Sequence, residues 1–197
     1  MSVETPGMYG LERIRTIRAY CDYLEMHLLN VAKAWTILQD ALPHEKEVWD
    51  DFAFWVTHNM VREHDLSKMD AAEFTAFAEW FFGQFGRNYV ICADDSEGEE
   101  KHRTAKAAFD SAREHHKAQE PHHWENWTKA GQRFPGEASC HLMCMVADWM
   151  AMGMAFGDTA EEYYEREKSK IDLPEWAVKY LQRIFAALRN NTENGNG

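Results

Sequence analysis

Apolar residues recur along much of the chain at intervals of three and four, the spacing of one face of an α-helix. Over residues 11–40 this spacing forms one stripe, made of Ile17, Tyr20, Leu24, His27, Val31, Ala34 and Leu38. Further helices are predicted over residues 45–63, 101–117 and 139–156. Strand-like alternation, internal repeats and a linker long enough to split the chain are absent from the sequence. The pattern therefore predicts an all-α protein of a single domain.

Turn and capping residues place the first helix boundaries. Pro43 breaks the first stripe before the second predicted helix begins. Asp70, with Glu73 three residues later, has the spacing of a capping box. We expect this box to open a helix rich in Phe and Trp, which ends near Gly83 or Gly86.

The second half of the chain has similar signals. The acidic residues 93–100 predict a surface loop, and a short helix is expected to start at His122 after Pro121. Residues 131–136 predict a further loop. Asp158, with Glu161 three residues later, is the predicted cap of the next segment. A last helix is expected from Pro174, which suits a first turn, to about residue 190.

The length of 197 residues suits one domain, and 45% hydrophobic residues supply a core. We expect residues 1–9 to form a flexible N-terminal arm, residues 10–190 the helical domain, and residues 191–197 a disordered tail. These boundaries follow from composition at the two ends of the chain.

Charge and cysteine content narrow the function classes. The formal net charge of −12 disfavours binding to duplex nucleic acid or to anionic membranes. It does not exclude a phosphate-bearing substrate, because a metal ion can reverse the local field. Four cysteines without a CxxC pair indicate free thiols in a reducing cytoplasm. Cys140 and Cys144 can share a helix face, where core thiols are commoner than zinc ligands.

Two polar residues stand in apolar segments. His27 belongs to the first stripe, so its ring should face the core; a core histidine with hydrogen-bond partners is the common explanation of such a position. Asp148 is the one charged residue between Leu142 and Gly157. An unpaired buried carboxylate costs on the order of several kcal/mol, so it needs a cation, a metal or hydrogen bonds. A metal ligand and a carboxylate that caps a neighbouring helix both remain open.

The dipeptide His64-Asp65 joins a neutral nitrogen ligand to an anionic oxygen ligand, a combination that suits a first-row divalent metal. Lys68 follows three residues later. Its ammonium group could hold a phosphate oxygen, and an ordinary solvated lysine is the alternative.

A histidine-rich segment lies between residues 114 and 124. It contains four histidines, namely His115, His116, His122 and His123. Pro121 turns the chain between the two pairs, so several imidazoles could point to one place as metal ligands. A polar helix end is the alternative interpretation.

The candidate ligands occur in a defined order along the chain. That order is His27, His64-Asp65, His115/His116, His122/His123 and Asp148. It resembles the HD-domain superfamily, helical metalloproteins whose ligands follow H…HD…H…H…D. The resemblance implies an HD-like helical bundle. It also implies that the first histidine, the His-Asp pair and the last aspartate hold one metal, while the middle histidines add a second.

Longer segments are similar to an uncharacterised HD-like family of phages and bacteria, a numbered domain of unknown function. Its pattern HDxSKxxxxEF is matched by residues 64–74. Its pattern HHxxNNPHHWxYW is matched at His115, His116, Pro121, His122, His123, Trp124 and Trp127. Its EMxxDW segment is similar to residues 143–149, and its WYE to residues 163–165. The resemblance covers about residues 26–173. Three positions depart from it: Glu120 stands where the family tends to have asparagine, Asn126 replaces the aromatic residue before Trp127, and Met143 follows Leu142 rather than a glutamate.

The resemblance implies a metal-dependent phosphohydrolase, in which metal-activated water attacks a nucleotide or another small phosphate ester. Asp65 would bind or bridge the metal, and Lys68 would hold the phosphate. Glu73 could act as a base behind the ligands, although capping its own helix is the preferred explanation. His116 and one of the two residues His122 and His123 would bind a second metal, or instead contact the leaving phosphate.

The expected cofactor is one or two divalent transition-metal ions (Mn, Fe, Co, Ni or Zn), and Mg also fits. The expected location is the cytoplasm, or the host cytoplasm for a phage protein, and a homo-oligomer is allowed. Two alternatives remain open: a di-iron oxygenase of HD type, which needs the same ligands, and a non-catalytic binding module stabilised by a metal.

Overall fold

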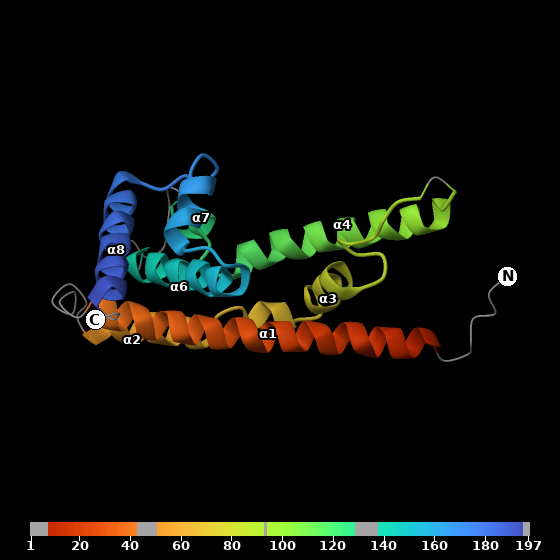
Figure 1. Ribbon diagram of the computed structural model, residues 1–197, viewed down its shortest axis with the longest axis horizontal. Helices are drawn as coiled ribbons and strands as arrows, with labels where there is room; N and C mark the ends of the chain where they lie inside the picture. The colour runs from red at the N-terminus through yellow and green to blue at the C-terminus, as the bar shows by residue number, and fades with distance from the viewer. Residues whose placement is uncertain (1–7, 43–50, 93, 129–137, 195–197) are drawn as a thin grey trace. The chain divides into compact units, whose positions relative to one another are not determined.

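The computed structural model describes residues 8–42, 51–92, 94–128 and 138–194, which are drawn as helices and connections in Figure 1. Within these residues the chain forms eight α-helices and one 3-10 helix, with no strand, which confirms the all-α prediction. The elements in chain order are α1 (Met8–Ala41), α2 (Asp51–Arg62), η2 (Leu66–Met69), α3 (Phe74–Phe82), α4 (Ser96–Gln119), α5 (Trp124–Trp127), α6 (Ala138–Phe156), α7 (Ala160–Glu167) and α8 (Glu175–Asn194).

The helices gather into two compact units, each with its own core. Unit 1 comprises Met1–Met26 and Asp65–Gln119, and unit 2 comprises His27–His64 and Glu120–Gly197. The chain passes from one unit to the other after Met26, which lies inside α1, and again after His64 and Gln119. Each unit is therefore assembled from two separate stretches of sequence.

Unit 1 has a small aromatic core. Tyr20 and Leu24 come from the predicted stripe of α1 and are buried with Phe77 of α3. Partly buried aromatic rings of α3 and α4 pack against them, and the rings of Tyr20 and Phe74 meet edge to face at 5.1 Å. Such edge-to-face pairs add to the free energy gained from burial of the rings. The apolar stripe thus explains the burial of α1 in this unit.

Unit 2 is built around α6. This helix contacts α2, α5, α7 and α8, and most of its side chains are buried. In Figure 1, α8 (blue) runs across the direction of α6 (cyan). The C-terminal part of the α1 stripe, Val31 to Leu38, joins the same core. A helix that is apolar on all sides belongs in the interior, as α6 shows.

The composition of α6 also passes a length-and-hydropathy test for a membrane span. Among the described residues, α6 is the one helix that passes this test, with a mean hydropathy of 1.2. Inside the protein, 56% of its most apolar stretch is buried. Core helices of soluble proteins pass the same test, so this property is weak evidence for a membrane.

The predicted acidic loop is shorter than expected. The helix α4 begins at Ser96, inside the predicted loop of residues 93–100. Asp95 Oδ1 accepts a hydrogen bond from the backbone N–H of Gly98 at 2.9 Å, which is the geometry of an N-cap. Glu97 and Glu99 then lie in the first turn, where negative charge is favourable to the helix dipole.

Both predicted capping boxes are wrong. Glu73 precedes α3 but makes no capping hydrogen bond with its side chain, although α3 does end at the predicted Gly83. The box that opens α7 is not formed by Asp158 and Glu161. It lies one residue later, where Thr159 Oγ1 accepts from the N–H of Glu162, and the carboxylate of Glu162 accepts from the N–H of Thr159. Threonine followed by glutamate fits the box better than two acidic residues.

The ends of the predicted elements differ by a few residues. The helix α1 begins at Met8, inside the predicted arm of residues 1–9, and α8 continues to Asn194, beyond the predicted end near residue 190. The predicted loop over residues 131–136 and the start of the helix predicted over residues 45–63 lie outside the described residues. The predicted domain boundaries therefore stay predictions.

Two glycines shape the end of α6. Gly157 has a φ of 87°, the left-handed region that favours glycine, and its N–H donates to the carbonyl of Gly153 at 2.7 Å. A Cβ on Gly153 would lie 2.2 Å from the carbonyl oxygen of Asp158. The chain can turn closely against α6 only because Gly153 has no side chain.

The substitution Gly153→Ala is therefore expected to lower the free energy of unfolding by about 1–3 kcal/mol, since a methyl group must displace backbone. Urea unfolding followed by tryptophan fluorescence measures the change. Gly10→Ala in α1 is the control, because its Cβ meets no atom within 4 Å. That variant should be neutral or more stable by up to about 1 kcal/mol. Equal stability of the two variants would contradict the close approach.

Candidate metal centre

Three polar side chains meet inside unit 2. His27 comes from α1, His64 follows α2, and Asp148 comes from α6. The Nε2 atoms of the two histidines are 3.3 Å apart, and each lies 3.4 Å from Asp148 Oδ1. The histidines are 4% and 1% exposed, while 19% of the Asp148 side chain remains exposed. Three potential ligand atoms thus form a nearly equilateral triangle.

This triangle has the dimensions of a metal-binding face. An ion about 2.0–2.1 Å from each ligand would place neighbouring ligand atoms about 3.0 Å apart in octahedral and about 3.4 Å apart in tetrahedral coordination. Hydrogen bonds alone fit less well. If the Nε2 atoms of His27 and His64 both carry protons, each can donate to Asp148, but the two N–H groups then face each other across 3.3 Å. If only one of them carries a proton, the other nitrogen faces the Asp148 carboxylate without a hydrogen to donate. The donor set therefore fits a cation.

Electrostatics keep Asp148 in the form that a ligand needs. Burial raises the pKa of its carboxyl group, but a hydrogen bond from His64 and the charges of His64, His122 and His27 lower it by more. The pKa of Asp148 therefore lies well below its usual range, and the group is a carboxylate at neutral pH. Its neighbours are histidines from three other segments.

The remaining histidines of unit 2 extend this cluster. The ring of His122 lies 4.2 Å from the ring of His64, and the ring of His123 lies 4.5 Å from that of His122. Both come from the segment just before α5, whose N-cap is His123. The predicted turn between the two His pairs thus brings the second pair to the candidate centre of this unit.

Cys144 is a buried thiol of the unit 2 core, as the sequence predicted, and it also lies beside the histidine cluster. Its Sγ lies 3.8 Å from His64 Nδ1, and His64, His122 and Cys144 place ligand atoms within 4.8 Å of one another. Cys144 precedes Asp148 by four residues, so both side chains lie on one face of α6. The four-residue spacing between Cys144 and Asp148 is the sequence signal that could have indicated Cys144 as a ligand. The apolar residues around Cys144 favoured a core position instead.

A second polar cluster lies in unit 1 around Glu73. The side chain of Glu73 is fully buried and accepts hydrogen bonds from His115 Nδ1 at 2.8 Å, His116 Nδ1 at 3.0 Å and Ser67 Oγ at 3.2 Å. These bonds explain why Glu73 does not cap its helix. A carboxylate on Nδ1 fixes the ring of His116 and leaves Nε2 as the atom with a lone pair.

Asp65 stands at the other side of His116. His116 Nε2 lies 3.3 Å from Asp65 Oδ1, and Lys68 Nζ forms an ion pair with Asp65 Oδ2. Lys68 is 16% exposed at its side chain, so the alternative of an ordinary solvated lysine is wrong. Asp65 therefore has an imidazole and an ammonium group as neighbours on its two oxygens.

The backbone of Asp65 is unusual. Its φ of 59° places it in the left-handed region, the one non-glycine residue with positive φ in the described ranges. This conformation is costly for most residues, although aspartate tolerates it better than larger residues do. Strained backbone of this kind often occurs at functional sites.

The predicted site residues thus fall into two clusters, one in each unit. Unit 2 brings together His27, His64, His122, His123 and Asp148. Unit 1 brings together Asp65, Lys68, Glu73 and His116, with His115 at the same carboxylate. His64 and Asp65 are consecutive, so a single peptide bond joins a residue of each cluster.

The hydrogen bonds of Glu73 lead to a stability prediction. In Glu73→Gln, one carboxylate oxygen is replaced by an N–H₂ group, which cannot accept a hydrogen bond. The remaining amide oxygen is a weaker acceptor for the two histidines and Ser67 than a carboxylate. We expect the free energy of unfolding to fall by about 1–3 kcal/mol, the cost of buried polar groups without good partners. Urea unfolding measures it, with Glu114→Gln as control, because Glu114 is 66% exposed at its side chain. A Glu73 variant as stable as this control would refute the described hydrogen bonds.

Comparison with known proteins places the chain in a family. No curated protein and no solved structure matches it. Residues 16–193 match the model of DUF5662, described as a family of unknown function. That description contains no mention of an HD domain, so membership of the HD superfamily stays a prediction, whereas the expected family of unknown function is confirmed. Since the match spans most of the chain, the protein belongs to the DUF5662 family.

Proposed function

We propose that the protein is a metal-dependent phosphohydrolase that acts on a nucleotide or another small phosphate ester. The observation that carries the proposal is the triangle of His27 Nε2, His64 Nε2 and Asp148 Oδ1, with sides of 3.3–3.4 Å. Nitrogen and carboxylate ligands together suit Mn, Fe, Co, Ni or Zn. Asp65, the residue after His64, is the proposed fourth ligand.

A divalent ion at this place would supply a Lewis acid and lower the pKa of a water molecule, which is the chemistry that phosphate-ester hydrolysis needs. The exposed part of the Asp148 side chain is consistent with access for water and substrate. A site closed on all sides would lack this access.

Lys68 supports the choice of a phosphate substrate. The protein has a formal net charge of −12, so a phosphate ester needs local positive charge in order to bind. Lys68 lies beside Asp65, and an ammonium group is a common partner of phosphate oxygens. We infer that Lys68 exchanges part of its contact with Asp65 for a phosphate oxygen when substrate binds.

Glu73 has a positioning role in this proposal. Its carboxylate holds Nδ1 of His116, so Nε2 of the same ring faces Asp65. In this proposal the ring binds a second ion or contacts the leaving phosphate, because the carboxylate on Nδ1 fixes its tautomer and orientation. Glu73 therefore acts through His116 in this proposal and does not serve as a base on the substrate itself.

A second candidate function is a non-catalytic module with a structural metal. The observation in its favour is Cys144, because a thiolate near two imidazoles, His64 and His122, is a ligand set typical of zinc. Such an ion would be held tightly and would contribute to folding rather than to turnover.

Metal content tests the proposed centre. Protein purified without added metal should contain a transition metal, and Asp148→Asn and Asp65→Asn should each lose most of it, because each removes a charged ligand. Asp110→Asn is the matched control, since Asp110 lies on α4 and contacts Lys106 at the surface. Elemental analysis by plasma mass spectrometry gives the stoichiometry. Full metal content in both ligand variants, with normal folding, would show that the centre is wrong.

Activity tests the reaction. With Mn²⁺ or Mg²⁺ added, we expect phosphate release from nucleoside monophosphates or p-nitrophenyl phosphate, and a loss of at least about 100-fold in kcat/KM for Asp148→Asn. Lys68→Ala should raise KM more than it lowers kcat. Iron with an absorbance change under oxygen, and no phosphate release, would support the oxygenase instead. Tightly held zinc that is lost in Cys144→Ser, with no activity, would support the structural module.

A further inference from the structure

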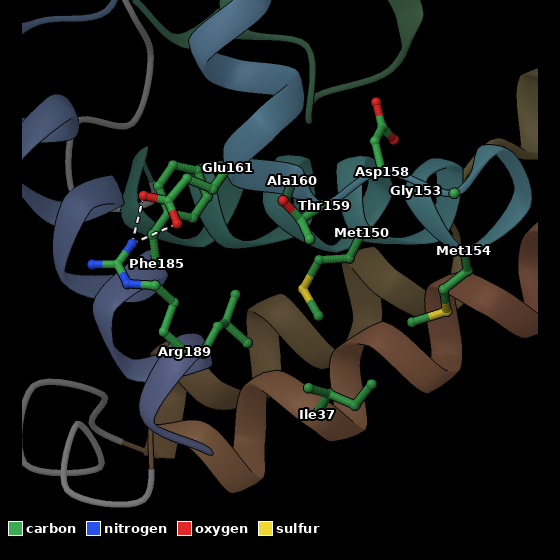
Figure 2. A pocket seen from close by; sticks show the side chains of 12 residues that line it. Ile37, Met150, Gly153, Met154, Asp158, Thr159, Ala160, Glu161, Phe185 and Arg189 are labelled. Carbon is green, nitrogen blue, oxygen red and sulfur yellow. Dashed lines mark hydrogen bonds and ion pairs between the residues drawn. The ribbon is translucent and has the colours of Figure 1, made fainter. Parts of the chain in front are cut away.

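Unit 2 contains a pocket whose lining includes none of the candidate metal ligands (Figure 2). Its volume is about 480 Å³, within the range of roughly 300–1,000 Å³ that is typical of small-molecule sites. Four elements, α1, α6, α7 and α8, contribute lining residues. A space bounded on several sides by different helices suits a compact molecule better than an extended chain.

The interior of the pocket is apolar. Met150 and Met154 extend from α6, Ile37 comes from α1, and Phe185 comes from α8 (Figure 2). Leu188 of α8 also lines the pocket. Aliphatic, aromatic and thioether groups offer contact by dispersion and burial, without hydrogen bonds. The two methionines can adjust to different ligand shapes, because their side chains are unbranched and flexible.

The charged groups at the rim are paired with one another. Arg189 Nη1 contacts both carboxylate oxygens of Glu161, as the dashed lines in Figure 2 show. Asp158 accepts a hydrogen bond from Arg166 at 2.8 Å, and Thr159 belongs to the capping box of α7. A charged ligand would have to replace one of these partners and would gain little net energy, whereas an uncharged ligand leaves them in place.

The end of α6 gives this pocket a fixed wall. Gly153 allows the carbonyl of Asp158 to lie against the helix, and the left-handed Gly157 turns the chain toward α7. The rim residues therefore stand close to the apolar side chains of α6, which keeps the pocket compact.

We propose that this pocket binds a small, uncharged and predominantly apolar molecule. The size of the pocket, the apolar interior and the paired charges of the rim all lead to this class of ligand. The site is independent of the proposed hydrolase activity, since it uses none of the residues of that activity.

The uncharged fluorophore N-phenyl-1-naphthylamine is a suitable probe. We expect one probe to bind each chain, with a blue-shifted emission and a Kd in the micromolar range. Met154→Trp should weaken binding at least tenfold, because the larger side chain fills space in the pocket that Met154 lines. Leu188→Trp blocks the same space from α8. Met26→Trp is the control: Met26 is 57% exposed on α1 in unit 1 and should leave binding unchanged.

The charge of the ligand is tested separately. The anionic probe 1-anilinonaphthalene-8-sulfonate should bind at least tenfold more weakly than the uncharged probe. The double variant Glu161→Gln/Arg189→Gln should keep binding of the uncharged probe within twofold. Equal or tighter binding of the sulfonate would overturn the uncharged class. Unchanged probe binding in both tryptophan variants, with normal circular dichroism, would overturn the site. Light scattering that shows Met154→Trp dissociating a dimer would assign the surface to a second copy of the chain instead.

Discussion

A carboxylate inside an apolar helix is the constraint on which unit 2 depends. Asp148 stands in α6, whose other side chains are largely buried and uncharged. Taking such a charge out of water costs on the order of several kcal/mol unless compensating groups surround it. His27 and His64 supply this compensation from α1 and from the end of α2. The position of three helical segments in the unit is thus linked to one charged group.

Different faces of α6 contribute to the candidate metal centre and to the apolar pocket. One face carries Cys144 and Asp148 toward the histidines, while Met150 and Met154 line an apolar pocket. A helix with apolar side chains on all sides can serve both, because it has no face that must remain in solvent. The polar centre is confined to a few atoms, and the rest of α6 packs against its neighbours.

Periodicity predicted the helices well because it reflects burial of one face. The stripe of α1 lies in the cores of both units from Tyr20 to Leu38, although Ile17 at its start is exposed. The ligands were predictable as residue types, but their partners were not. Glu73 has the spacing of a capping box with Asp70, yet its carboxylate bonds to His115 and His116, more than 40 residues away. Cys144 is the core thiol that the sequence predicted, but the sequence does not show that His64 lies against it. Local patterns cannot rank contacts that the fold creates between distant segments.

The left-handed backbone of Asp65 restricts which residues the position can accept. Asparagine would keep the backbone conformation, which it tolerates well, but would remove the negative charge. Glutamate would keep the charge, but its longer side chain is seldom found in this conformation. Backbone and charge therefore exclude different substitutes, and aspartate is the residue that meets both demands. If the charge were not required, the left-handed backbone would still restrict the position to residues such as asparagine. If the backbone were not restrictive, the charge would still require an acidic residue.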